Sequence, residues 1–315
     1  MTRSISAATV FLIFAICLLA STDLFAARKN GFVLDDALVP VREIRSGGPP
    51  KDGIPALDMP DVTTAAEADY LDDADRVLGI NIRGRARAYP IRILNHHEIV
   101  NDVVGGEMIA VTWCPLCGSG IAFVSEVNGR ALEFGVSGLL YNSDVLMYDR
   151  QTESLWSQIM KTAITGEMKG SKLTTVSLVH TTWRDWRSKH PDTEVLSLHT
   201  GYRRNYDKNP YAGYERQSQL YFPVNNEDRS YPRKSLVIGL EVDGHFKAYP
   251  FEELKAGPER FTDSVGGVKV EVTFDNDNDT ASIVSLDGRD LSAMILYWFA
   301  WSAFHPDTKI YTADQ

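Results

Sequence analysis

Two cysteines separated by two residues carry the clearest chemical pattern in the sequence. A Cys-Pro-Leu-Cys sequence lies at residues 114–117, and Gly118 follows it. Such a pair serves as a thioredoxin-like redox site, as a metal-binding turn or as a small disulfide clip. In the redox arrangement the pair opens a helix, whose dipole stabilises the thiolate. Residues 121–124 are typical of a strand instead, which disfavours that arrangement.

The same sequence between two strands is typical of a metal-binding turn. Proline fixes the turn, glycine permits an unusual backbone angle, and both sulfurs face one point. Because a tetrahedral site needs three or four ligands, Cys114 and Cys117 require a partner. His96 and His97 are the nearest imidazoles, and neighbours on a strand point to opposite faces, so only one should reach the sulfurs. We therefore predict a zinc or copper site.

Further polar residues follow the cysteines and could support such a site or bind a polar ligand. A methionine could add a thioether ligand, with Met147 and Met108 as marginal candidates. Asp149 could equally form a turn with an ion pair to the next residue. Ser143 lacks the Gly-x-Ser-x-Gly sequence and paired base of a serine hydrolase, so hydrolysis is not expected. The additional site candidates are His96, Met147, Asn142, Ser143, Asp144 and Asp149.

The remaining histidines carry less chemical information. His190 and His305 recur in two similar passages, which indicates a structural role. His180, His199 and His245 show no pattern beyond that of a solvated surface. We therefore expect none of these five in the site.

Composition and the N-terminus restrict the functional class. The formal net charge of −10 argues against nucleic-acid binding, which needs a basic surface. Arg3, an apolar run at residues 7–20 and small residues up to Ala27 predict a secretory signal peptide over residues 1–27. The apolar run is about 14 residues, shorter than the roughly 20 needed to span a bilayer. We expect a periplasmic or extracellular protein without stable membrane insertion after cleavage, and an N-terminal anchor is the alternative.

Export also bears on the cysteines. Cys17 lies inside the predicted signal peptide, so cleavage leaves Cys114 and Cys117 alone in an oxidising compartment. A single close pair cannot staple a chain of 315 residues. The two cysteines are therefore expected to serve chemistry or metal binding.

The chain contains an internal repeat. Residues 78–90 match residues 238–250, and residues 190–193 match residues 305–308. The first copy holds an extra stretch near residues 130–176. The second copy lacks the cysteine pair and the adjacent histidines, so we assign the site to the first copy alone.

The repeat and the local patterning together predict the fold. We expect a β-rich α+β fold made of two diverged copies of one module, packed through short Trp-bearing helices. The expected strands are residues 77–82, 86–89, 108–113 and 120–127, and the expected helices are residues 182–189 and 293–304. The expected segments are an N-terminal wrapping segment at 28–72, a first module at 73–200 with the site and the insertion, a connector at 201–232 and a second, degenerate module at 233–315.

Several passages together resemble a bacterial family of unknown function, DUF3179. They are residues 97–102, 114–118, 141–150 and 155–158, with the closing Trp-x-x-Trp-x-x-x-His-Pro-Asp sequence. The resemblance covers Val77 to the C-terminus and implies a shared fold and site, without an established activity. In this family a tryptophan often precedes the histidine where this chain has His96. The resemblance therefore implies that His97 completes the site.

Three functions of different classes fit the sequence. The first is an exported metal-binding protein, with or without redox activity, that uses Cys114, Cys117 and His97. The second is a metal-free thiol-disulfide oxidoreductase that uses the same cysteines. The third is a non-catalytic binding module in which the pair is a structural clip. The sequence identifies neither a substrate nor a protein partner.

Overall fold

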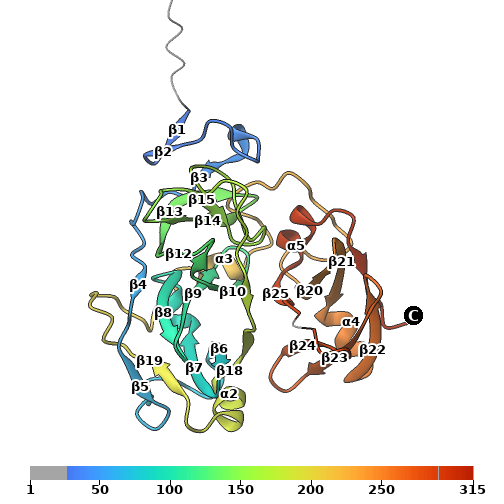
Figure 1. Ribbon diagram of the computed structural model, residues 1–315. Helices are drawn as coiled ribbons and strands as arrows, with labels where there is room; N and C mark the ends of the chain where they lie inside the picture. Colours follow the sequence, from blue (N-terminus) through green and yellow to red (C-terminus); the bar gives the residue numbers. More distant parts are fainter. Residues whose placement is uncertain (1–26, 290, 315) are drawn as a thin grey trace, which may run out of the picture.

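Five sheets of three to five strands make up most of the fold, and the described residues form two further sheets of two strands each. The computed structural model describes residues 27–289 and 291–314. It is 40% strand and 11% helix, and the five sheets are arranged as the blades of a β-propeller (Figure 1). The predicted α+β fold of two diverged copies of one module is therefore wrong. The predicted signal peptide lies outside the described residues, apart from Ala27.

Two of the blades contain the repeated sequence. In both, an antiparallel hairpin is flanked in the sheet by a parallel strand on one side and an antiparallel strand on the other. Blade 1 has the order β18–β6–β7–β19–β5, with β5 (Val62–Thr64), β6 (Arg76–Ile82), β7 (Arg85–Pro90), β18 (Val179–Thr182) and β19 (Glu194–Leu196). Blade 4 has the order β25–β20–β21–β26, with β20 (Leu236–Val242), β21 (His245–Pro250), β25 (Met294–Tyr297) and β26 (Lys309–Ile310).

The other three blades are built from meandering strands. Blade 2 has the order β17–β10–β9–β8–β4, with β4 (Leu57–Asp58), β8 (Ile99–Val104), β9 (Glu107–Cys114), β10 (Ser119–Val124) and β17 (Thr175–Val176). Blade 3 has the order β16–β15–β14–β13–β3, with β3 (Arg45–Ser46), β13 (Phe134–Tyr141), β14 (Asp144–Asp149), β15 (Leu155–Ser157) and β16 (Thr162–Ala163). Blade 5 has the order β22–β23–β24, with β22 (Arg260–Val265), β23 (Val268–Asp275) and β24 (Thr280–Ser285).

Blade 3 explains why the two-module description fails. The stretch near residues 130–176 was expected as an insertion into a first module, yet residues 134–163 form four strands of a blade of their own. Some of its apolar side chains are buried in the cluster that blade 3 shares with blades 2 and 4, and others pack against residues 32–44 of the N-terminal segment. The sequence repeat therefore marks similar blades within one propeller and does not divide the fold into two modules.

Buried side chains join neighbouring blades around the ring. One cluster joins blades 1 and 2, a second joins blades 2, 3 and 4, and a third joins blades 4 and 5. Arg76 at the start of β6 donates from Nη1 to the backbone oxygen of Asn278, 2.7 Å away, beside β24. This bond links blade 5 to blade 1.

The predictions of single strands and of one hairpin agree better with the structure than the predicted fold does. The hairpin predicted over residues 77–89 is confirmed as β6 and β7, with Arg83 and Gly84 both at positive φ in the two-residue turn. The strands predicted on both sides of the cysteines are confirmed as β9 and β10. Their register places Cys114 opposite Ser119.

The tryptophan-bearing helices are α2 (Trp183–Lys189) and α5 (Trp298–Phe304). The second was predicted to begin at residue 293, but the apolar residues of β25 pair with β20 instead. Each helix packs on its own blade, where a tryptophan ring covers a glycine: Trp186 covers Gly79, and Trp301 covers Gly239. The predicted packing of one Trp-bearing helix on the other is therefore wrong.

The remaining elements are short. Residues 28–72 supply the outer strands β3, β4 and β5 of three blades. The other elements are η1 (Val41–Glu43), α1 (Ile91–Leu94), α3 (Ala212–Glu215), α4 (Phe251–Ala256), β1 (Arg28–Lys29), β2 (Phe32–Val33), β11 (Glu126–Val127) and β12 (Arg130–Ala131).

Candidate metal centre

The two cysteines lie in the tight turn between β9 and β10. Cys114 is the last residue of β9, and the Cys117 amide donates to its backbone oxygen over 3.1 Å. Gly118 has φ of +62°, a conformation that favours glycine. Both cysteines are free thiols, with exposures of 1% and 0%. The turn therefore places two buried sulfurs side by side.

A second hairpin turn, from blade 3, meets the sulfurs. Asn142 and Ser143 form the two-residue turn between β13 and β14, and both have positive φ. This turn directs the Ser143 carbonyl toward the thiols. The Cys117 Sγ donates to that oxygen at 3.4 Å, and the Cys114 Sγ contacts it at 3.8 Å.

Asp144, the first residue of β14, completes the group. One carboxylate oxygen of Asp144 and the sulfurs of Cys114 and Cys117 all lie within 4.8 Å of one another. Asp144 is fully buried, and its Oδ2 accepts hydrogen bonds from the Ile159 amide at 3.1 Å and the Ser157 hydroxyl at 3.4 Å. Its Oδ1 has no hydrogen-bond partner among the described residues. One carboxylate oxygen is thus left available.

Burial favours the protonated forms of Asp144 and Cys117. It raises the pKa of Asp144 to about 8. It also raises the pKa of Cys117 well above its ordinary value, and the neighbouring Cys114 adds to this shift. A cation bound between these groups would act in the opposite direction, because it favours their charged forms.

The structure does not bring His97 to the two sulfurs; the third group there is the Asp144 carboxylate. His97 precedes β8, is fully buried and uses both ring nitrogens elsewhere. Its Nδ1 lies 2.8 Å from the Pro55 oxygen, and its Nε2 lies 2.7 Å from the Tyr206 hydroxyl. Burial lowers the pKa of His97 to about 4, so the imidazole is neutral near pH 7. It ties three separate segments together.

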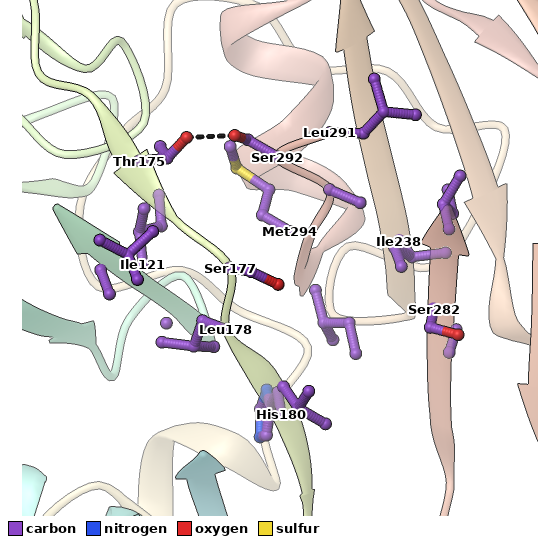
Figure 2. A pocket seen from close by; sticks show the side chains of 18 of the residues that line it. Ile121, Thr175, Ser177, Leu178, His180, Ile238, Ser282, Leu291, Ser292 and Met294 are labelled. Carbon is purple, nitrogen blue, oxygen red and sulfur yellow. Dashed lines mark hydrogen bonds between the residues drawn. The ribbon is translucent and has the colours of Figure 1, made fainter. Parts of the chain in front are cut away.

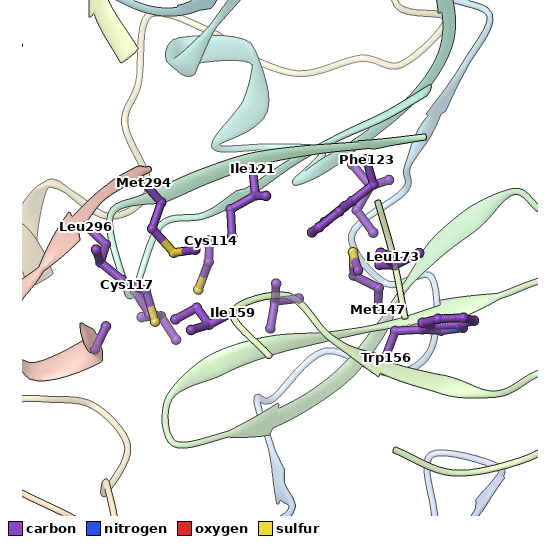
Figure 3. Packing of buried hydrophobic residues seen from close by; sticks show 14 of the residues in the cluster. Cys114, Cys117, Ile121, Phe123, Met147, Trp156, Ile159, Leu173, Met294 and Leu296 are labelled. Carbon is purple, nitrogen blue, oxygen red and sulfur yellow. The ribbon is translucent and has the colours of Figure 1, made fainter. Parts of the chain in front are cut away.

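Most of the additional candidates have structural contacts instead. His96 Nε2 lies 2.9 Å from the Lys208 oxygen. Met147 is buried among apolar side chains on the far side of the core from Cys117 (Figure 3), and Met108 is 40% exposed. Asn142 accepts from the Asn225 amide at 2.9 Å.

Asp149 lies at the other end of β14 from Asp144. Its carboxylate accepts from the Thr152 amide at 2.6 Å and from the Trp156 indole at 2.9 Å. Asp149 therefore holds a turn, and among the residues predicted after the cysteines only Ser143 and Asp144 reach the sulfurs.

The segment at residues 201–232 covers the site. The Tyr214 hydroxyl donates to the Leu116 oxygen at 3.0 Å, and the Ser143 hydroxyl donates to the Phe222 oxygen at 2.8 Å. The Tyr211 hydroxyl donates to Glu98 at 3.0 Å, and burial raises the pKa of Glu98 to about 7. Sequence reasoning missed these covering residues, and the tyrosine-rich composition of the segment was the one available sign.

Met294 was also missed from the sequence. It belongs to the same buried cluster as the two cysteines, and its thioether lies on their side of the core (Figure 3).

Cys114, Cys117 and Asp144 could hold a metal ion, and the Ser143 oxygen lies beside the two sulfurs. Thiolate sulfur and carboxylate oxygen are both ligands that zinc accepts in proteins.

The fold and these contacts define a β-propeller with a buried Cys-Cys-Asp group. Residues 51–296 match the family described as "Protein of unknown function (DUF3179)", so the chain belongs to this family. The resemblance seen in the sequence motifs is confirmed. No curated protein and no solved structure matches the chain. In the described part of the chain, no helix is long and apolar enough to cross a membrane.

Proposed function

We propose that the protein binds one zinc ion through the sulfurs of Cys114 and Cys117 and the carboxylate of Asp144, with the Ser143 oxygen as fourth donor. The observation that carries this proposal is the buried Asp144 carboxylate, which has one oxygen within 4.8 Å of both sulfurs and an Oδ1 without a hydrogen-bond partner among the described residues. An unpaired buried oxygen is costly, and a cation would satisfy it.

The oxygen donors favour zinc over copper. Copper(I) prefers soft sulfur ligands, whereas zinc accepts thiolate and carboxylate in the same tetrahedral site. The group is also closed: Cys117 and Asp144 are fully buried, and four donors fill a tetrahedron. These features support a structural role, in which zinc fastens the β9–β10 turn of blade 2 to the β13–β14 turn of blade 3.

A metal-free thiol-disulfide oxidoreductase is the second candidate. It is favoured by the two free thiols of Cys114 and Cys117 and by a carboxyl group beside them. Exchange requires direct attack of one sulfur on another, and exposures of 1% and 0% oppose such access. Because Cys114 and Cys117 are free thiols, the structure gives no support to the third function, a binding module in which the pair forms a disulfide clip.

Elemental analysis of protein purified without chelator or affinity tag tests the proposal. The wild type and His97→Ala should each hold one zinc per chain, and Cys117→Ser should lose most of it. A reduced wild type without stoichiometric metal would refute zinc binding and favour the redox function. Retention in Cys117→Ser with loss in His97→Ala would refute the ligand set.

We also propose that the protein works outside the cytoplasm. This rests on the N-terminal sequence alone, in which Arg3 precedes an apolar run and small residues up to Ala27. An intact-mass measurement of protein from the periplasmic fraction should give a chain without residues 1–26. A mass that includes them would favour the membrane anchor.

A further inference from the structure

A cavity of about 190 Å³ lies where edge strands of four blades meet (Figure 2). Those strands are β17, β18, β24 and β25. Ile121, Ile238 and Ile283 form buried, apolar parts of its wall, and the lining residues Ser177 and Ser282 are exposed. The cavity is therefore mostly apolar and partly open to solvent.

His180 places one polar group in this apolar wall. It lies at one end of the cavity (Figure 2) and is only 7% exposed, although the sequence suggested a solvated residue. The Nδ1 of His180 is completely buried and has no hydrogen-bond partner among the described residues, so Nε2 is the ring nitrogen that a molecule in the cavity could reach. Its ring packs edge-to-face on Trp113, and its backbone oxygen accepts from Arg76 at 3.0 Å and Thr280 at 2.7 Å. The imidazole is thus held in place without a partner of its own.

The His180 imidazole is also neutral. Burial lowers its pKa well below the ordinary value, and the Arg76 guanidinium acts in the same direction. A neutral imidazole keeps one nitrogen that accepts a hydrogen bond. The hydroxyls of Thr175 and Ser292, which also line the cavity, bond to each other (Figure 2). These two hydroxyls are half-buried, whereas His180 is a buried side chain of the wall that can accept a hydrogen bond.

We propose that this cavity binds a small neutral molecule with an apolar ring and one hydroxyl group, which donates a hydrogen bond to His180. The size fits, because an apolar cavity of about 150 Å³ accommodates benzene. The apolar wall excludes charged ligands, since burying an unpaired charge is unfavourable. The proposal is independent of zinc binding.

Calorimetric titration of the full-length protein with phenol and with toluene tests the proposal, since toluene replaces the hydroxyl with a methyl group. The wild type should bind phenol saturably and more tightly than toluene. In His180→Phe the ratio of phenol to toluene affinity should fall about fivefold or more, as expected for one lost hydrogen bond. His199→Phe, an exposed control outside the cavity, should keep the wild-type ratio.

Ser282→Trp provides a second variant, because this exposed lining residue can be enlarged without disturbing the core. It should abolish binding of both probes while thermal unfolding stays near that of the wild type. The proposal is overturned if the wild type shows no saturable binding of phenol. It is equally overturned if Ser282→Trp binds phenol as tightly as the wild type, or if folded His180→Phe keeps the wild-type ratio.

Discussion

The Asp144 carboxylate lies within 4.8 Å of the Cys117 sulfur, although Asp144 begins β14 of blade 3 and Cys117 lies in the β9–β10 turn of blade 2. The β9–β10 turn supplies the thiols, and the β13–β14 turn supplies the carboxylate and the Ser143 oxygen. The Oδ1 of Asp144 is buried and has no hydrogen-bond partner in the part of the chain that the structure describes. The site therefore influences stability as well as metal binding.

Stability of the metal-free protein should fall as pH rises, because Asp144 keeps its proton in the folded state. Its pKa is about 8 when folded, against an ordinary value of 3.8. The unfolded chain therefore releases this proton at a lower pH, and the stabilisation is lost as pH rises toward 8. Asp144→Asn removes the titration and should raise Tm at pH 8 by at least about 3 °C more than at pH 5.

Thermal unfolding in the presence of chelator, at pH 5 and pH 8, gives this comparison. Protonation of buried histidines such as His97 destabilises the wild type and Asp144→Asn equally at low pH. Its effect therefore cancels in the Tm difference between the two proteins. If the Tm difference between Asp144→Asn and the wild type is the same at pH 5 and pH 8, the pKa of Asp144 is not raised in the folded state.

His97→Ala should destabilise the fold without removing the metal. The substitution deletes two buried hydrogen bonds, to Pro55 and Tyr206, and leaves a cavity. The expected loss is about 2–4 kcal/mol in urea denaturation. His96→Ala removes a single solvent-exposed contact, with the Lys208 oxygen, and should cost about 1 kcal/mol or less. Equal losses in the two variants would contradict this role for His97.

Gly79→Ala and Gly239→Ala should both destabilise the protein strongly. An added Cβ at Gly79 would lie 2.3 Å from the Trp186 ring, and one at Gly239 would lie 2.2 Å from the Trp301 ring. The overpacking should cost about 1–3 kcal/mol or more. At Gly213 in α3 an added Cβ would meet the Tyr221 hydroxyl at 3.9 Å, an ordinary contact, so Gly213→Ala should be neutral or slightly stabilising. Urea midpoints near the wild-type value for the first two variants would show that the rings can move aside.

Local patterns predicted local structure correctly because the interactions that decide it are close in sequence. The β6–β7 hairpin follows from strand alternation and the turn at Arg83 and Gly84. The strands on both sides of the cysteines follow from the same reasoning. The boundary of α5 was wrong because β20 recruits β25, a contact that helical periodicity cannot anticipate.

Long-range relationships were the part that the sequence did not determine. His97 is closer than Asp144 to the cysteines along the chain, yet Asp144 reaches them because blade 3 packs against blade 2. The internal repeat was visible, but nothing in it showed that residues 134–163 form a separate blade. His180 has no sequence pattern of its own, because its burial comes from strands of other blades.

The zinc affinities of Asp144→Asn and Asp149→Asn distinguish a metal ligand from a buried aspartate that only holds a turn. Both residues are fully buried on β14, but only Asp144 lies beside the cysteines. Competition titration against a zinc indicator should show that Asp144→Asn weakens zinc binding about tenfold or more, while Asp149→Asn leaves it near the wild-type value. Equal zinc affinity in Asp144→Asn and the wild type would contradict the proposed site.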